Sequence, residues 1–401
     1  MTNMVNTKCI FPSIDCVGCM ICKDICPKNA ISEKISKKGF SYPFVDKTIC
    51  INCGKCVKSC LTEKKVVYDI RSPLYFASKA KSEKLRMVAS SGGIFPLLAK
   101  QVLDMHGVVY GVKLDNSLKV KHSRAESWDE CKEFFKSKYV QSDMSGIFKL
   151  ILNDLKKGLI VLFSGCPCQC YSVKTALKNY FYEGSILFVD FFCHGAPSPM
   201  VYADFVKHMT KKYKKEIKYV CFRDKEKMTP LPSCRGLRIY FDSFDVIDKN
   251  ENNKLINLFF SNYISRPCCY NCKFTGEKRV SDVTLGDYWG CEKHYPDFFD
   301  EKGISIISIN TLKGEKFFNL LLNDIDYIDV SRNNFSQPML YHPPLKGSFY
   351  RLFWMFYKVI GYNNTSLLFL IFINIKKKCL TNSSSIKRLI KSLFIGFHKF
   401  K

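Results

Sequence analysis

The middle of the chain alternates between two patterns of apolar residues. Near-continuous apolar runs are typical of strands buried on both faces, and runs with apolar residues every three or four positions are typical of helices. The expected strands are 108–114, 159–165, 186–195, 235–241, 283–290 and 303–310. The expected helices are 92–107, 145–158 and 199–213. This alternation predicts an α/β domain extending to about residue 345.

The two ends of the chain have a different composition. The first 66 or so residues are too few for an ordinary hydrophobic core and are rich in cysteine. From residue 349 the sequence FYRLFWMFYKVIGY begins a tail that is aromatic, aliphatic and basic. We therefore expect three parts, with bounds 1–66, 67–345 and 346–401. The predicted fold class is α+β/α/β, with a small N-terminal domain, a larger α/β domain and a basic, hydrophobic C-terminal helical tail.

Composition narrows the classes of function. The chain has 401 residues, of which 47% are hydrophobic, and this is typical of a globular protein. Its 62 basic and 36 acidic residues give a net charge of +26. The sequence has no zinc finger, RNP motif or helix-turn-helix signature. We therefore favour a membrane surface or an acidic redox partner over nucleic acid as the reason for the charge.

The chain contains 21 cysteines, and eight of them form two compact runs. Residues 16–26 read CVGCMICKDIC, followed by Pro27, and residues 50–60 read CINCGKCVKSC. The first ten residues carry no secretory signal, so we expect a cytoplasmic, reducing environment in which disulfides are rare. Zinc sites usually join two cysteine pairs through a longer loop. The spacing and its repeat are instead typical of bacterial ferredoxins with two 4Fe–4S clusters.

In the ferredoxin pattern, the fourth cysteine of each run binds the cluster of the other run. The first predicted ligand set is Cys16, Cys19, Cys22 and Cys60. The second predicted set is Cys50, Cys53, Cys56 and Cys26. Cys60 departs from the pattern because Leu61, and not proline, follows it.

Further cysteines follow the expected strands, where α/β folds usually bind ligands. They occur in LFSGCPCQC (162–170), FFCHG (191–195) and RPCCYNCKF (266–274). These positions could form a third cluster, although buried cysteine is also a common small core residue. SSGG (90–93), before an expected helix, could cradle a phosphate, but serine and glycine are also ordinary helix-start residues.

Seven motifs, in order, resemble the coenzyme F-420 hydrogenase/dehydrogenase beta-subunit family of iron–sulfur flavoproteins. They are GFSYPFVD with CINCGKC, SSGG, SKYVQSD, LFSGCPCQ, CHGAPS, RPCCYNCKF and SDVTLGDYWG, between about Cys16 and Gly290. The resemblance implies FAD in the α/β domain and a third 4Fe–4S cluster near it. The implied FAD residues are Ser90, Ser91, Gly92, Gly93, Ser137, Lys138, Tyr139 and Gln141.

The resemblance also implies ligands for the third cluster. These are Cys168, Cys193, Cys269 and Cys272. The adjacent Cys166, Cys170 and Cys268 are possible substitutes for them. His194 is a candidate proton donor near the flavin, and a histidine that orients a loop is an equally good interpretation. Asp287 is expected to fix a turn. Cys9, Cys131, Cys221, Cys234, Cys291 and Cys379 match no ligand pattern.

The combination of flavin and clusters suggests an oxidoreductase, because it links one-electron carriers to two-electron chemistry on an organic substrate. Relatives in the family use the deazaflavin coenzyme or tetrapyrroles, and others accompany surface-polysaccharide genes. The Lys-, Asn-, Ile- and Phe-rich composition favours the polysaccharide setting. The alternative is an electron-transfer adaptor without its own substrate, which serves a partner enzyme.

The tail suggests membrane contact rather than a membrane span. The apolar run at 366–375 has about half of the roughly twenty residues that a spanning helix needs. Lysine, arginine and large apolar residues recur at helical spacing in 385–401, which is the pattern of a helix lying in a membrane surface. A helix packed on the protein's own core or on a partner is the competing interpretation.

Overall fold

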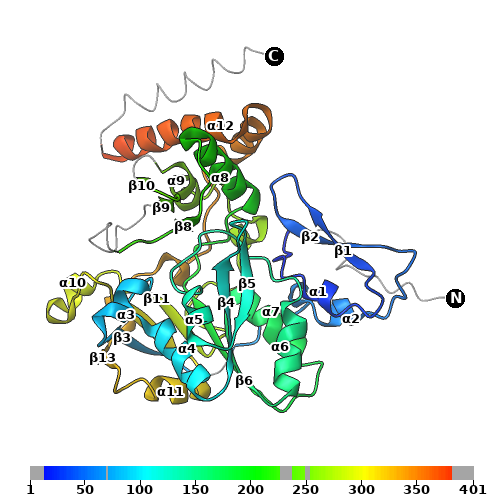
Figure 1. Cartoon of the computed structure of the whole chain (residues 1–401), viewed down its shortest axis with the longest axis vertical. Coiled ribbons are helices and arrows are strands. Elements are labelled where there is room, and N and C mark those ends of the chain that lie inside the picture. Colours follow the sequence, from blue (N-terminus) through cyan, green and yellow to red (C-terminus); the bar gives the residue numbers. More distant parts are fainter. Residues whose placement is uncertain (1–12, 69–70, 226–236, 249–252, 382–401) are drawn as a thin grey trace.

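The computed structural model describes residues 13–68, 71–225, 237–248 and 253–381, and Figure 1 shows their arrangement. A small N-terminal unit lies beside a large mixed sheet that is flanked by helices. A lobe built around α8, α9 and α12 lies above the large sheet in this view, and the N-terminal unit lies to the right. The predicted mixture of helices and sheet, with a ferredoxin-like N-terminal unit, is confirmed.

The N-terminal unit has two halves of similar construction. In each half a cysteine loop leads into a helix of one turn, and the turn begins after a residue with positive φ, Met20 in the first and Gly54 in the second. An antiparallel hairpin connects the halves. The elements are α1 (Ile21–Asp24), β1 (Ile31–Ile35), β2 (Ser41–Val45), α2 (Lys55–Lys58) and η2 (Leu61–Glu63).

The large sheet has the strand order β13-β3-β12-β11-β7-β6-β4-β5. Its four middle strands, β11, β7, β6 and β4, are parallel to one another, whereas the strands toward both edges pair in antiparallel fashion. The strands are β3 (Leu74–Ala80), β4 (Val108–Leu114), β5 (Val120–Ala125), β6 (Ile160–Ser164), β7 (Ser185–Phe191), β11 (Val283–Asp287), β12 (Ser305–Ile309) and β13 (Ile325–Asp329).

Helices cover both faces of this sheet, which explains why its middle strands read as continuous apolar runs. On one face α4 and α11 pack against side chains such as Leu162 and Val189. On the other face α6 and α7 pack against their neighbours Phe163 and Phe188. The helices are α3 (Glu83–Val88), α4 (Ile94–Asp104), α5 (Trp128–Lys132), α6 (Ile147–Lys156), α7 (Pro167–Leu177), α10 (Cys291–His294) and α11 (Leu312–Asn319), with 3-10 turns η3 (Pro267–Asn271), η4 (Pro296–Phe298), η5 (Arg332–Asn334) and η6 (Pro338–Leu340).

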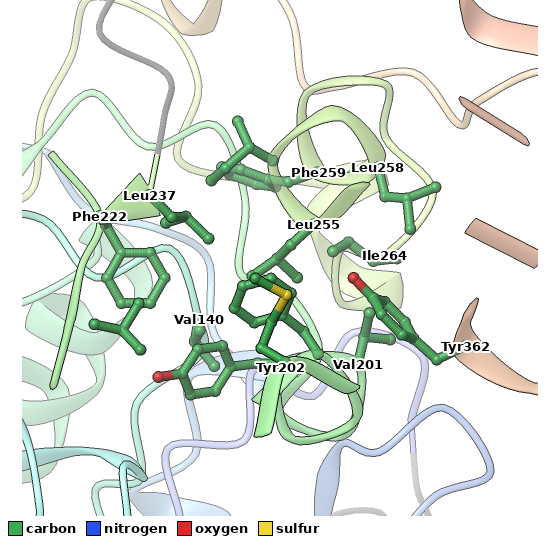
Figure 2. Close-up of a cluster of buried hydrophobic side chains, with 14 of the residues drawn as sticks. Val140, Val201, Tyr202, Phe222, Leu237, Leu255, Leu258, Phe259, Ile264 and Tyr362 are labelled. Atoms are coloured by element: carbon green, nitrogen blue, oxygen red, sulfur yellow. The ribbon is translucent and has the colours of Figure 1, made fainter. Parts of the chain in front are cut away.

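The lobe built around α8, α9 and α12 joins these three helices to a three-stranded antiparallel sheet. Figure 2 shows its buried side chains, among them Tyr202 of α8, Phe222, Leu255 of α9 and Tyr362 of α12. The elements are α8 (Pro199–Tyr213), β8 (Tyr219–Cys221), β9 (Leu237–Tyr240), β10 (Asp245–Asp248), α9 (Lys254–Phe260) and α12 (Tyr350–Thr381).

The first part of the expected C-terminal tail belongs to this lobe. By length and composition Tyr350–Ile375 is a candidate membrane span. However, the backbone is not helical at Gly361 (φ 73°), and the ring of Phe353 lies 5.1 Å from that of Phe369. Phe349 and Phe372 are also in contact, at 5.4 Å. The segment is therefore an antiparallel hairpin. Its first arm, 350–360, is much shorter than the roughly twenty apolar residues of a spanning helix, and the apolar part of its second arm ends at the lysines of 376–378. The basic segment after residue 381 lies outside the described residues.

Candidate functional site

The first predicted ligand set, Cys16, Cys19, Cys22 and Cys60, is brought together in the structure, and we call it the inner site. Burial raises the pKa of the Cys19 thiol to about 12. Burial and the neighbouring thiols of the set also raise the pKa of Cys22. A bound metal removes such a proton, because the thiolate is the ligand.

The second predicted set, Cys26, Cys50, Cys53 and Cys56, lines one open hollow of about 420 Å³, and we call it the outer site. Cys53 is exposed, so this site lies at the protein surface. Lys28 and Lys55 belong to its rim and are exposed. Four thiols around one hollow, with apolar walls from Ile31 and Val45, are the donor chemistry that iron–sulfur clusters require.

A third group of cysteines lines a separate hollow of about 690 Å³, the strand-end hollow. Cys166 and Cys168 follow β6, and Cys193 follows the adjacent parallel strand β7. The carboxyl ends of neighbouring parallel strands meet at one sheet edge, which is where α/β folds bind ligands. The 3-10 turn η3 and the residue after it supply the remaining cysteines. The six that line the hollow are Cys166, Cys168, Cys193, Cys268, Cys269 and Cys272.

The thiols of this hollow interact with one another. A hydrogen bond with Cys193, together with burial, raises the pKa of Cys166. Burial raises the pKa of Cys272 to about 12. Cys269 accepts a hydrogen bond from the Ala196 amide at 3.4 Å. Cys170, one of the substitutes weighed from sequence, is buried and directs its thiol at the Gly165 carbonyl instead.

One serine connects the inner site to the strand-end hollow. The Ser172 hydroxyl donates its hydrogen to the Cys168 carbonyl at 2.7 Å, and its oxygen lies beside the Cys19 thiol. Both cysteines pack against the same buried cluster, which includes Val17 and Tyr171. The two groups of thiols are therefore neighbours across the boundary between the N-terminal unit and the large sheet.

The cysteine groups differ from sites for one metal ion. A four-iron cluster binds each thiolate to a different iron, so its ligands lie further apart than those of a single ion. Throughout the part of the chain that the structure describes, no group of three or more His, Cys, Asp or Glu side chains is arranged to hold one metal ion.

The predicted flavin residues form two groups. One group, residues 90–93 with Ser137, lies at the start of α4, and the other is Lys138, Tyr139 and Gln141. Ser90 and Ser137, 47 positions apart, come within 3.1 Å of each other through their hydroxyls. Gly93 directly precedes α4 and has a left-handed backbone conformation (φ 84°). Ser91 instead donates to the Ile304 carbonyl. At Gly92 a Cβ would lie 2.4 Å from the Ser78 carbonyl oxygen, so packing against the sheet already requires glycine there.

The other three flavin candidates have protein partners. The Lys138 ammonium donates to the Glu133 and Phe135 carbonyls, and burial lowers its pKa to about 7. The Tyr139 ring packs against aromatic side chains of the α9 lobe. The Gln141 amide donates to the Val17 carbonyl at 2.9 Å, which places its side chain at the inner site.

His194 and Asp287 both make contacts that stabilise the fold. The His194 ring packs edge-on against Phe259, at 5.2 Å, and beside Phe260. Asp287 pairs with Arg223 at 2.7 Å, and its carbonyl accepts a hydrogen bond from Gln337. Asp287 therefore joins several segments at the end of β11, beyond the turn expected from sequence.

Three basic residues near these sites could not be predicted as site residues from the sequence. Arg279 lines the strand-end hollow and pairs with the buried carboxylate of Asp190. Lys225 is buried and donates to the Ser91 carbonyl, beside the predicted phosphate cradle. Arg266 reaches from the start of η3 to the inner site. Each depends on contacts between segments far apart in the chain.

Comparisons with known proteins give matches for the N-terminal unit and for much of the domain that follows it. Residues 159–332 match the family model for the C-terminal region of the coenzyme F420 hydrogenase/dehydrogenase beta subunit, and residues 15–64 match that for the 4Fe-4S dicluster domain. The ferredoxin-type protein NapF of Haemophilus influenzae is 34% identical over 55 residues, which are 14% of this chain and 31% of that protein. The chain thus spans about a third of the length of this curated relative.

A solved structure described as "Xenon derivatization of the F420-reducing [NiFe] hydrogenase complex from Methanosarcina barkeri" contains a similar chain. The identity is 14% and the TM-score 0.45, over 67% of this chain and 86% of the other. The resemblance inferred from the sequence motifs is confirmed by the two family matches. Residues 159–332 thus match the C-terminal region of the coenzyme F420 hydrogenase/dehydrogenase beta subunit, and a 4Fe–4S dicluster domain at residues 15–64 precedes that region.

Proposed function

We propose that this protein is an iron–sulfur flavoprotein oxidoreductase that acts on an organic substrate. The observation that carries the proposal is the connection of the inner site to the strand-end hollow through Ser172, which makes two groups of thiols neighbours. Iron–sulfur clusters supply single electrons, and a flavin can combine two of them in a hydride-type transfer. Residues 1–66 would then be the electron-transfer domain and residues 67–345 the domain that binds flavin and substrate.

In this proposal the chain's own residues hold three 4Fe–4S clusters. The inner and outer sites would hold one each, and Cys168, Cys193, Cys269 and Cys272 the third. The start of α7 supports the third site, because Cys168 lies in its first turn, where the helix dipole favours negative charge. The apolar cluster around Tyr171 and Phe274 limits the access of water to that side of the hollow.

For FAD we propose a site at the start of α4. The support is the meeting of Ser90 with Ser137 and the presence of Lys225 and Lys138 nearby, since hydroxyls, amides and cations together suit a phosphate. We propose precursors of surface polysaccharides as the first class of organic substrate to test. His194 would act near the flavin only if its ring can leave the contact with Phe259.

The partner that we propose is an acidic redox protein that docks at the outer site. The exposed lysines Lys28 and Lys55 line this site, and the exposed side chain of Ile51 lies beside them. Complementary charge accelerates association and weakens with salt. We also propose peripheral membrane contact through the tail, because lysine, arginine and large apolar residues recur at helical spacing in 385–401.

Metal and flavin analysis of anaerobically purified protein tests the proposal. We expect about twelve irons and about twelve acid-labile sulfides per chain, together with about one FAD. Cys269→Ser or Cys272→Ser should lower the iron count by about four. Cys291→Ala is the matched control, because Cys291 is buried and lies outside the three sites. About eight irons per chain in the wild type would show that the third cluster is absent. Protein without flavin would favour the alternative function, an electron-transfer adaptor without its own substrate.

The flavin site needs its own variant. A change at Gly92 would disturb β3 and β12 whether or not flavin binds there. Ser90→Asp is better, since it puts a negative charge where a phosphate would approach, and Ser117→Asp in an exposed turn is its control. We expect loss of FAD with full iron in the first variant only. Full flavin occupancy in Ser90→Asp would place the flavin elsewhere.

A further inference from the structure

The side chain of Arg266 spans the boundary between the strand-end hollow and the inner site. Its backbone amide donates to the Ala196 carbonyl, and its carbonyl accepts from the Cys269 amide, so the backbone belongs to the hollow. Its guanidinium points the other way, where Nε donates to the Cys16 carbonyl at 2.7 Å and Nη2 to the Ser41 carbonyl at 2.8 Å. The Cys16 thiol lies 3.9 Å from Nη2.

This guanidinium is buried without an acidic partner. Arg266 is 1% exposed, and within the described ranges no Asp or Glu oxygen lies within 4.0 Å of it. Its remaining hydrogen-bond acceptor is the Gln141 amide oxygen, 3.0 Å from Nη1. The ring of Tyr42 lies 4.4 Å from the centre of the charge. Arginine stays protonated in proteins, and a buried charge needs a charge of opposite sign.

Gly18, in the cysteine loop of the inner site, leaves the space that the Arg266 guanidinium occupies. A Cβ at Gly18 would lie 2.5 Å from Arg266 Nη1, and the residue has a φ of +71°. The cysteine loop of the inner site therefore has the only residue type that fits both the backbone conformation and the guanidinium. Arg279, the other buried arginine beside the hollow, differs because Asp190 offsets its charge.

We propose that Arg266 is the counter-charge of the inner site and raises the reduction potential of a cluster bound there. The inference rests on the proposed cluster ligands. Reduction adds an electron to a negatively charged group, so a buried positive charge nearby favours the reduced form. The lysines around the outer site are exposed, and water and salt screen their charges. Arg266 is thus a positioning residue that would draw electrons inward.

Redox titration of the anaerobic holoprotein, followed by electron paramagnetic resonance, tests the proposal. We expect Arg266→Gln to lower the equilibrium constant for reduction of the inner cluster at least tenfold, or by about 59 mV for one electron. The outer cluster should change less than about twofold and serves as the internal control. Cys53→Ser, which removes an outer ligand, identifies the inner signal. An unchanged inner potential, or equal shifts of both clusters, would overturn the proposal.

A second pair of variants separates charge from folding. Gln141→Glu places a carboxylate beside the guanidinium and loses only the hydrogen bond to the Val17 carbonyl, whereas Gln141→Met loses the hydrogen bonds to both Val17 and Arg266 without adding charge. We expect a lowered inner potential in the first and a change below about twofold in the second. Equal effects of the two would show that packing, and not charge, sets the potential. Wild-type protein with no iron at the inner site would instead refute the cluster assignment, so the two failures are distinguishable by the iron count.

Discussion

Replacing Phe353 by alanine tests whether the α12 hairpin is part of the folded lobe. Phe353 is fully buried, and its ring lies between those of Tyr263 (5.3 Å) and Phe369 (5.1 Å). Phe369 belongs to the second arm of the hairpin and Tyr263 follows α9. The Phe353 side chain therefore holds both arms against the lobe.

The expected loss of stability follows from this burial. Phe→Ala substitutions in well-packed cores cost about 3 to 5 kcal/mol, because buried surface is lost and a cavity remains. Val359 on the same helix arm is 75% exposed, so Val359→Ala should change the free energy of unfolding by less than about 0.5 kcal/mol.

Urea unfolding under anaerobic, reducing conditions measures both variants. The ring of Trp354 lies 5.3 Å from that of Phe353, so the part of the tryptophan fluorescence that comes from Trp354 reports on the hairpin. We expect a large shift of the urea midpoint in Phe353→Ala and almost none in Val359→Ala. A loss below about 1 kcal/mol in Phe353→Ala, with the lobe otherwise intact, would mean that the hairpin is a separate tail and that our account of the packing is wrong.

Three further outcomes follow from the structure. Burial lowers the pKa of His122 to about 4 from 6.5, so the folded protein binds a proton less readily than the unfolded chain. The free energy of unfolding should therefore fall by up to about 3 kcal/mol as the pH drops from 6.5 toward 4. Thermal unfolding of His122→Gln should show a weaker dependence on pH. Removal of residues 382–401, rather than of the packed hairpin, should abolish salt-sensitive pelleting with anionic liposomes, and equal pelleting with neutral ones would exclude an electrostatic contact. Lys28→Glu with Lys55→Glu should slow reduction by an acidic ferredoxin and weaken its salt dependence, whereas Lys100→Glu on α4 should not.

Most of the central sheet was predictable because its strands are buried on both faces. Strands β4, β6, β11 and β12 lie within the expected apolar runs, and β7 begins one residue before its run, at Ser185. Helices α4, α6 and α8 likewise lie within the segments with helical periodicity. Strands β5 and β13 escaped prediction because their sequences, VKHSRA and IDYID, are polar near the sheet edges. Helix α7 escaped because it is buried on nearly all sides and therefore has little amphipathic pattern.

The sites were predictable to the extent that local spacing determines them. A C-x2-C-x2-C loop brings its own thiols together, whatever the rest of the fold does. Arg266 could not be identified in this way, because its partners at positions 16, 41 and 141 meet it only in the folded protein. At Gly92 the sequence suggested close approach to a ligand, whereas the structure shows close approach to β3 and β12. A glycine in a motif can thus report on packing rather than on binding.

The six thiols of the strand-end hollow exceed the four that a cluster binds, and their surroundings favour one choice among them. The Cys166 side chain accepts from the amide at the third position of α7, and Gln169 completes the capping box. Its hydrogen bond with Cys193 then makes it a donor to a neighbouring thiolate. Cys268 has the same relation to Cys269 and lowers its pKa. We infer that these two cysteines support the ligands and stabilise their negative charge, so replacing Cys166 by alanine should shift the cluster potential downward while the iron count stays the same.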